Sequence, residues 1–289
     1  MSIKERGYTH WDGKLKESRF PWWPISRLGI RLTFKKKFFK FFFFLSLSPA
    51  LAYLVGIYVS ERMEEFRFMV QESVSFLQIN PNYFKSYLTG DFLYFMIILI
   101  LVFAASGLIS DDLRHNSLQL YFSRPLKKRD YFMGKSSVIV FFLFILTMIP
   151  SLVLFLMKLI FSGSFKFFST YPWLPLSIIG YSLLLTVFFS FYALFLSSLS
   201  PNRRYVAVLI LGFYFFSDIL FGIFKGIFHS HYFSLLSIKS NLQQVGALFF
   251  QQKTPYEISW VFSLLVLLGV CVLSALVLRK KVQGVRIIK

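Results

Sequence analysis

The stretch DFLYFMIILILVFAASGLIS, residues 91–110, decides the fold class, because it begins with one charged residue and is otherwise almost wholly apolar. A helix needs about 20 such residues to cross a bilayer core of ~30 Å. Five further apolar runs of spanning length lie at roughly 38–59, 136–161, 174–199, 205–228 and 258–278. The sequence therefore predicts an all-α polytopic membrane protein with six transmembrane helices.

The composition supports the same fold class. Of the 289 residues, 56% are hydrophobic and only 16% are charged, which is far from the usual composition of a soluble domain. Six spans leave no room for a large catalytic domain beside them. The single cysteine, Cys271, excludes an internal disulfide and a thiolate metal site. The net charge of +19 would suggest nucleic acid in a soluble protein, but here it bears on membrane orientation, and no nucleic-acid partner is expected.

The basic residues divide unevenly between the two sides of the predicted membrane. Segments 1–40, 111–135, 200–204 and 279–289 hold 24 of the 32 Lys and Arg residues. Because basic residues collect in cytoplasmic segments, these segments are predicted to be cytoplasmic, with both termini on that side.

The chain divides into three parts. Residues 1–37 form a cytoplasmic segment that is too polar for a cleavable signal, 38–278 form the six-helix domain, and 279–289 form a basic tail. Within 24–37, basic and apolar residues form separate helical stripes, which predicts an interfacial helix on the inner leaflet, with Lys35, Lys36, Lys37 and Lys40 near anionic lipid. The alternative is a simple orientation signal. A second surface helix is expected within 60–90, and 229–257 is either a polar connection or a re-entrant piece.

Signatures of enzyme chemistry are missing from the sequence. It has no H-E-x-x-H, G-x-S-x-G or G-x-G-x-x-G pattern. His229 and His231 have a spacing that could hold a metal, but no acidic or thiol partner is near them in sequence. Gly134-Lys135-Ser136 resembles the end of a Walker A loop, yet Arg129 stands where its first glycine is required. We expect neither a metal nor a cofactor in this chain, and no ATPase site.

The longest internal cytoplasmic segment is GLISDDLRHNSLQLYFSRPLKKRDYFMGK, residues 107–135. A helix over 111–121, ended by Pro125, would present apolar side chains beside acidic and basic ones, a mixed surface suited to a protein partner. The alternative is a solvated loop whose basic residues only orient the protein.

This segment resembles the cytoplasmic loop of ABC-2-type transporter permeases. The resemblance rests on Gly107-Leu108-Ile109, the acidic pair Asp111-Asp112, Ser117-Leu118, and the run Ser-Arg-Pro-Leu-x-x-Arg-x-Tyr-x-x-Gly-Lys at 123–135. Where many members carry Gly-Thr-Leu, this chain carries Asn-Ser-Leu at 116–118. Six spans, inward termini and an amphipathic helix before the first span are also family features.

The resemblance implies the membrane subunit of an ATP-driven exporter in the bacterial cytoplasmic (inner) membrane. It implies a separate ABC-type ATPase subunit, which holds ATP and Mg, and a second permease subunit, identical or related. The 110–135 loop would couple the two proteins as a coupling helix between spans 2 and 3. The residues expected at this contact are Asp111, Asp112, Arg114, Ser117, Leu118, Tyr121, Arg124 and Arg129.

A polar stripe is predicted on the fifth span, where Tyr214, Asp218, Gly222 and Gly226 recur every four residues. A charged side chain inside a membrane is costly, and glycines let another backbone approach, so the stripe is either a helix-packing face or part of a transport path. The second interpretation suggests an ion-coupled secondary transporter as an alternative function. A third possibility is a non-transporting membrane anchor for a cytoplasmic complex.

Overall fold

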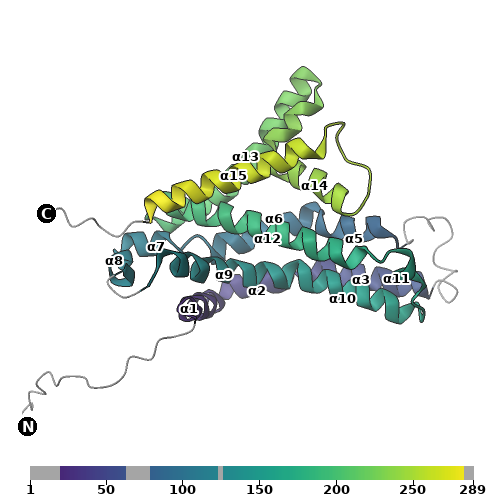
Figure 1. Cartoon of the computed structure of the whole chain (residues 1–289), viewed down its shortest axis with the longest axis horizontal. Coiled ribbons are helices and arrows are strands. Elements are labelled where there is room, and N and C mark those ends of the chain that lie inside the picture. Colours follow the sequence, from purple (N-terminus) through teal and green to yellow (C-terminus); the bar gives the residue numbers. More distant parts are fainter. Residues whose placement is uncertain (1–19, 63–78, 123–125, 283–289) are drawn as a thin grey trace, which may run out of the picture.

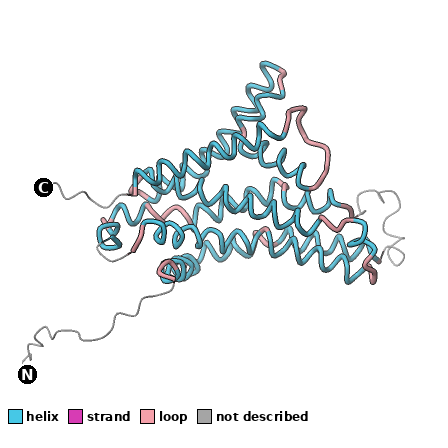
Figure 2. The backbone as a smooth tube through the Cα atoms, in the orientation of Figure 1, coloured by secondary structure: helices cyan, strands magenta, loops and turns pink. Residues whose placement is uncertain are grey.

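The computed structural model describes residues 20–62, 79–122 and 126–282, and this part of the chain contains helices and no strands (Figures 1 and 2). Six of its helical segments are long and apolar enough to cross a membrane, which confirms the predicted fold class and a multi-pass membrane protein. The segments are Lys37–Glu61, Pro81–Ala104, Lys128–Phe161, Leu174–Leu199, Arg203–Phe228 and Trp260–Lys281.

The first three spans are each built from two helices. They comprise α2 (Lys37–Leu45) with α3 (Ser48–Glu61), α5 (Pro81–Leu88) with α6 (Asp91–Ala104), and α9 (Lys128–Leu146) with α10 (Met148–Phe161). Pro150 follows the third break, and a proline cannot donate to the carbonyl four residues earlier. That carbonyl belongs to Leu146, and it accepts a hydrogen bond of 3.0 Å from the Tyr87 hydroxyl. The break is therefore satisfied by a neighbouring span.

The fourth span, α12 (Leu174–Leu199), lies at the centre of the bundle and contacts α9, α10, α13 and α15 (Figure 1). Its side chains, including Phe188 and Phe189, are largely buried. The first, fifth and sixth spans are mostly exposed within the single chain, although they are as apolar as the others. Their apolar faces are suited to lipid or to another subunit.

The helix before the first span, α1 (Trp23–Phe34), crosses the bundle, and Figure 1 shows it end-on beside α9, α10 and α12, which run horizontally. Gly134 of α9 allows this crossing, because a Cβ there would lie 2.8 Å from the Ile25 side chain. At the same point the Ser26 hydroxyl donates to the Gly134 carbonyl at 3.1 Å. The glycine that resembled part of a Walker A loop thus has a packing role.

The connection between the fifth span, α13 (Arg203–Phe228), and the sixth, α15 (Trp260–Lys281), is folded. It contains a 3-10 turn, His231–Leu236, and the helix α14 (Ile238–Phe249), which packs between α12, α13 and α15. The 12 residues of α14 rise about 18 Å, which is short of a full bilayer core. This arrangement favours the re-entrant alternative for 229–257.

Several predicted features fall outside the described residues. They are the tails 1–19 and 283–289, most of the expected surface helix within 60–90, and Arg124 with its neighbours at 123–125.

Candidate partner-docking loop

The loop between the second and third spans, residues 105–127, contains two short helices, α7 (Ser110–Arg114) and α8 (Ser117–Phe122). The single helix predicted over 111–121 is therefore wrong. Asn116 separates the two helices with a φ of 52°, a left-handed conformation that asparagine adopts more readily than most residues. The chain turns at this residue, so the loop folds back toward the spans.

The start of the loop is fastened to the central span. The Ser197 hydroxyl of α12 accepts hydrogen bonds from the backbone amides of Ile109 and Ser110, at 3.0 and 3.2 Å. It also donates to the Ser106 carbonyl at 3.2 Å. Ser197 is fully buried. It thus satisfies amides at the beginning of α7 as a capping side chain does, although it lies far away in sequence.

The middle of the loop is fastened to the third span by a buried ion pair. The Asp112 carboxylate lies 2.6 Å from the Lys135 ammonium group, and both side chains are nearly buried. The same carboxylate accepts a 2.6 Å hydrogen bond from the Tyr131 hydroxyl. Lys135 also lies 5.8 Å from the ring centre of Tyr121, and burial beside Asp112 raises the pKa of that tyrosine. Asp112, Tyr131 and Lys135 therefore each have a partner inside the chain.

Three separate segments meet beside Asp111 at the end of α6. The ammonium group of Lys36 donates to the Phe103 carbonyl at 2.6 Å, and the Arg203 guanidinium approaches the same oxygen at 3.5 Å. Burial, with the neighbouring Arg203 charge, lowers the pKa of Lys36 to about 8, while Asp111 acts in the opposite direction. Lys36, Asp111 and Arg203 line a cavity of about 340 Å³. Lys36 therefore points into the protein, unlike the exposed Lys35, Lys37 and Lys40 beside it.

The predicted contact residues divide into two groups. Asp112, Leu118 and Tyr121 anchor the loop, since Leu118 is buried in the core and Tyr121 packs against it. The exposed residues lie around the turn between α7 and α8 and at the start of α9, with Ser117 and Asp111 partly exposed beside them. The exposed positions in this region are Arg114, His115, Asn116, Gln119, Lys127, Lys128 and Arg129.

Sequence reasoning missed the residues that hold the loop in place. Ser197 and Arg203 lie on other spans, and a serine in an apolar helix gives no signal of its own. In the sequence, Lys135 is the last residue of the 123–135 run. Its pairing with Asp112 could not be predicted, because it depends on how α7 lies against α9.

The four residues of the predicted stripe on the fifth span have different surroundings in the structure. Tyr214 is buried, and the Asp218 carboxylate accepts a 2.9 Å hydrogen bond from the Ser237 hydroxyl and lies 3.9 Å from the Lys239 ammonium group. Gly222 and Gly226 are exposed, and a Cβ at either would meet nothing within 4 Å. Asp218 is thus a partnered polar residue, while the two glycines lie open on the surface.

Comparison with known sequences adds no relative: no family model and no curated protein matches this chain. Across residues 20–62, 79–122 and 126–282, no group of three or more His, Cys, Asp or Glu side chains is placed to hold a metal. The geometry instead offers a loop held against α9 and α12 by polar contacts, with exposed polar residues at its tip.

Proposed function

We propose that the chain is the membrane-spanning permease subunit of an ATP-driven exporter of the ABC-2 type, coupled to a separate ATPase subunit. The observation that carries the proposal is the loop at 105–127, which is fastened to two spans but exposes its tip. Ser197 holds its start and Lys135 holds Asp112, whereas Arg114 and Gln119 remain exposed.

This arrangement suits the transmission of force. A push on the exposed turn would reach α9 through the Asp112–Lys135 pair and α12 through Ser197, because neither contact has a flexible linker in between. A solvated loop that only orients the protein would need no such contacts. The exposed residues Arg114, His115 and Gln119 could supply hydrogen bonds and charge to a partner.

The proposal includes a second permease subunit, which is identical or related. The open surface around Gly222 and Gly226 supports it, since glycines in a membrane helix allow another helix to approach closely. The large exposed side chains of Ile219 and Ile223 lie on the same helix. The site for ATP and Mg belongs to the partner ATPase in this scheme.

The proposed location is the bacterial cytoplasmic membrane, with both termini inside. Basic residues at the loop end of the spans support this orientation, including Lys127, Lys128 and Arg129 before α9 and the three basic residues that end α15. Direct support would come from an impermeant thiol reagent. A cysteine at Gln119 in a Cys271→Ser background should react in inside-out vesicles and be protected in right-side-out vesicles.

The proposal is tested by purifying the chain from its own cells and identifying the proteins that accompany it. An ATP-binding subunit with a Walker A loop should copurify, and its ATPase activity should change when the permease is removed. An ATPase that binds without nucleotide-dependent substrate movement would favour the non-transporting anchor. Substrate movement by the purified chain alone would favour the secondary transporter.

One observation favours the secondary transporter as the second candidate. Lys239 lies 2.9 Å from the Asp91 carboxylate and 3.9 Å from that of Asp218. Two acids therefore share one base where the starts of α6 and α14 meet the interior of α13. Such a cluster could bind a proton or an ion. Transport driven by an imposed proton or sodium gradient, and lost in Asp218→Asn, would support this alternative.

A further inference from the structure

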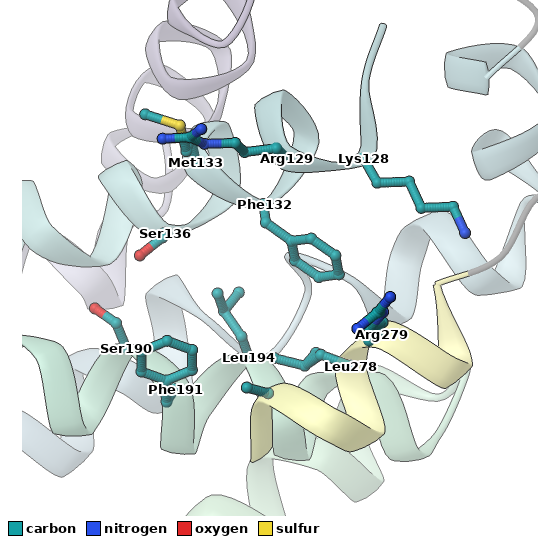
Figure 3. Close-up of a pocket in the computed structure, with 11 residues that line it drawn as sticks. Lys128, Arg129, Phe132, Met133, Ser136, Ser190, Phe191, Leu194, Leu278 and Arg279 are labelled. Carbon is teal, nitrogen blue, oxygen red and sulfur yellow. The ribbon is translucent and has the colours of Figure 1, made fainter. Parts of the chain in front are cut away.

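A pocket of about 480 Å³ lies between α9, α12 and α15 at the end of the spans nearest the 105–127 loop (Figure 3). Both α9 and α15 pack against α12, and the pocket lies between them. Its walls combine apolar side chains with basic ones. The lining residues used below are Lys128, Phe132, Ser190, Leu194, Ala275 and Arg279.

The pocket has a charged end and an apolar depth, while a third basic lining residue, Arg129, lies beside Met133 (Figure 3). Lys128 begins α9 and Arg279 lies in the last turn of α15, so both cations lie where their spans end. Figure 3 shows these two side chains on the same side of the pocket, with Phe132 between them and the serines. Ser136 lies two turns further along α9, about 12 Å from Lys128. The pocket therefore runs from the edge of the membrane into its apolar layer.

A buried hydroxyl in the wall has no partner. Ser190 is 4% exposed, and its oxygen makes no hydrogen bond within the described structure. Several serines and threonines on the spans bond to a carbonyl of their own helix, as Thr186 does to the Ser182 carbonyl at 2.7 Å, whereas the hydroxyls of Ser190 and of Ser182 itself do not. A buried polar group without a partner is energetically unfavourable. It usually indicates that a molecule outside the chain, such as water or a ligand, supplies the missing hydrogen bond. Ser190 thus offers a donor to an occupant.

We propose that this pocket binds one anionic glycerophospholipid taken from the adjoining leaflet. Its phosphate would lie between Lys128 and Arg279, an acyl chain would lie against Phe132 and Leu194, and the Ser190 hydroxyl would donate to an ester carbonyl. The lipid would fill the space between α9 and α15.

Charge and shape together select this occupant. A purely apolar chain would leave the two cations and the Ser190 hydroxyl unmatched. A small anion alone would leave the apolar walls open to water. A phospholipid satisfies all three features in the order in which they occur along the pocket.

Native mass spectrometry of the purified full chain tests the proposal, with dioleoyl phosphatidylglycerol and dioleoyl phosphatidylcholine as the probes. One phosphatidylglycerol should remain bound per chain, with phosphatidylcholine retained less. In Lys128→Gln/Arg279→Gln its affinity should fall about 30-fold, because each of the two basic contacts near a membrane contributes about 1 kcal/mol. The control Lys127→Gln/Lys280→Gln removes the same charge from exposed positions outside the pocket and should change the affinity less than about twofold.

A second pair of variants tests the apolar depth. Ala275→Phe should block the acyl chain and reduce binding, whereas Leu276→Phe, at an exposed neighbouring position, should not. Thermal unfolding of each variant confirms that it is folded. Equal losses in both charge pairs, equal retention of the two lipids, or undiminished binding in a folded Ala275→Phe would overturn the proposal. Competition by millimolar glycerol 3-phosphate as effective as that by the lipid would do the same, because the headgroup alone would then suffice.

Discussion

Two connections between spans contain short helices and many polar residues, yet they use them differently. In the 229–259 connection, Asn241 and Gln244 are buried and bond to backbone carbonyls, so the polar groups hold α14 inside the bundle. In the 105–127 loop, the polar contacts lie at its base, and Arg114 and Gln119 at its tip remain exposed. Polar composition alone therefore does not identify a docking surface. The difference lies in which polar groups already have partners.

The largest expected effect comes from the base of the 105–127 loop. Asp112→Ala leaves the Lys135 ammonium group nearly buried without its counter-ion, and breaking such a pair costs about 3–5 kcal/mol. We expect a large fall in the free energy of unfolding, measured by denaturant titration in detergent. The double variant Asp112→Leu/Lys135→Leu should recover a substantial part of it. No recovery would mean that the Asp112 contacts, rather than the unpaired lysine, dominate.

A smaller but clear loss is expected in the other connection. Gln244 donates to the carbonyls of Tyr256 and Ile258 and accepts from the Tyr256 amide, at 3.1, 2.6 and 3.3 Å. Gln244→Leu would leave these groups unpaired and should destabilise the protein by about 2–3 kcal/mol. Gln243→Leu on the same helix, where the side chain is half-exposed, is the matched control and should cost less. Equal losses would argue against the buried role of Gln244.

At the tip of the 105–127 loop, a substitution should weaken docking without lowering the stability of the chain. Arg114→Glu alters an exposed side chain, so the free energy of unfolding should change by less than about 0.5 kcal/mol. Association with the ATPase should nevertheless weaken, because the charge at the contact is reversed. Arg204→Glu makes the same change at an exposed position at the start of α13 and should leave association intact. If Arg204→Glu has the larger effect, the contact lies elsewhere.

A pH dependence is also expected at the junction beside Asp111. The pKa of Lys36 is lowered to about 8 from 10.5, so the folded chain releases a proton that the unfolded chain still binds between these values. The free energy of unfolding should therefore rise as the pH increases from about 8 toward 10.5. Lys36→Met should remove this component of the slope. An unchanged slope would assign it to other groups.

The membrane fold could be predicted from sequence because each span needs a long apolar run. The predicted run at 174–199 matches α12 at both ends, and the others differ by a few residues or by the extra turns of α5 and α9. The breaks inside spans were harder to predict, although Pro150 accounts for one of them. For the candidate site, the sequence predicted the segment 107–135 but not the role of each residue in it. The roles of Asp112 and Leu118 depend on contacts with residues on other spans, which no local pattern encodes.

The most direct test of the docking loop is site-specific photocrosslinking in intact cells. A photoreactive amino acid at Gln119, which is exposed, is compared with one at Lys253, which is exposed in the other connection. The adducts are identified by mass spectrometry. We predict that position 119 crosslinks to an ATP-binding subunit with a Walker A loop and that position 253 does not. The absence of that subunit from the adducts at 119, or its equal capture at 253, would contradict the proposed docking of an ATPase on the 105–127 loop.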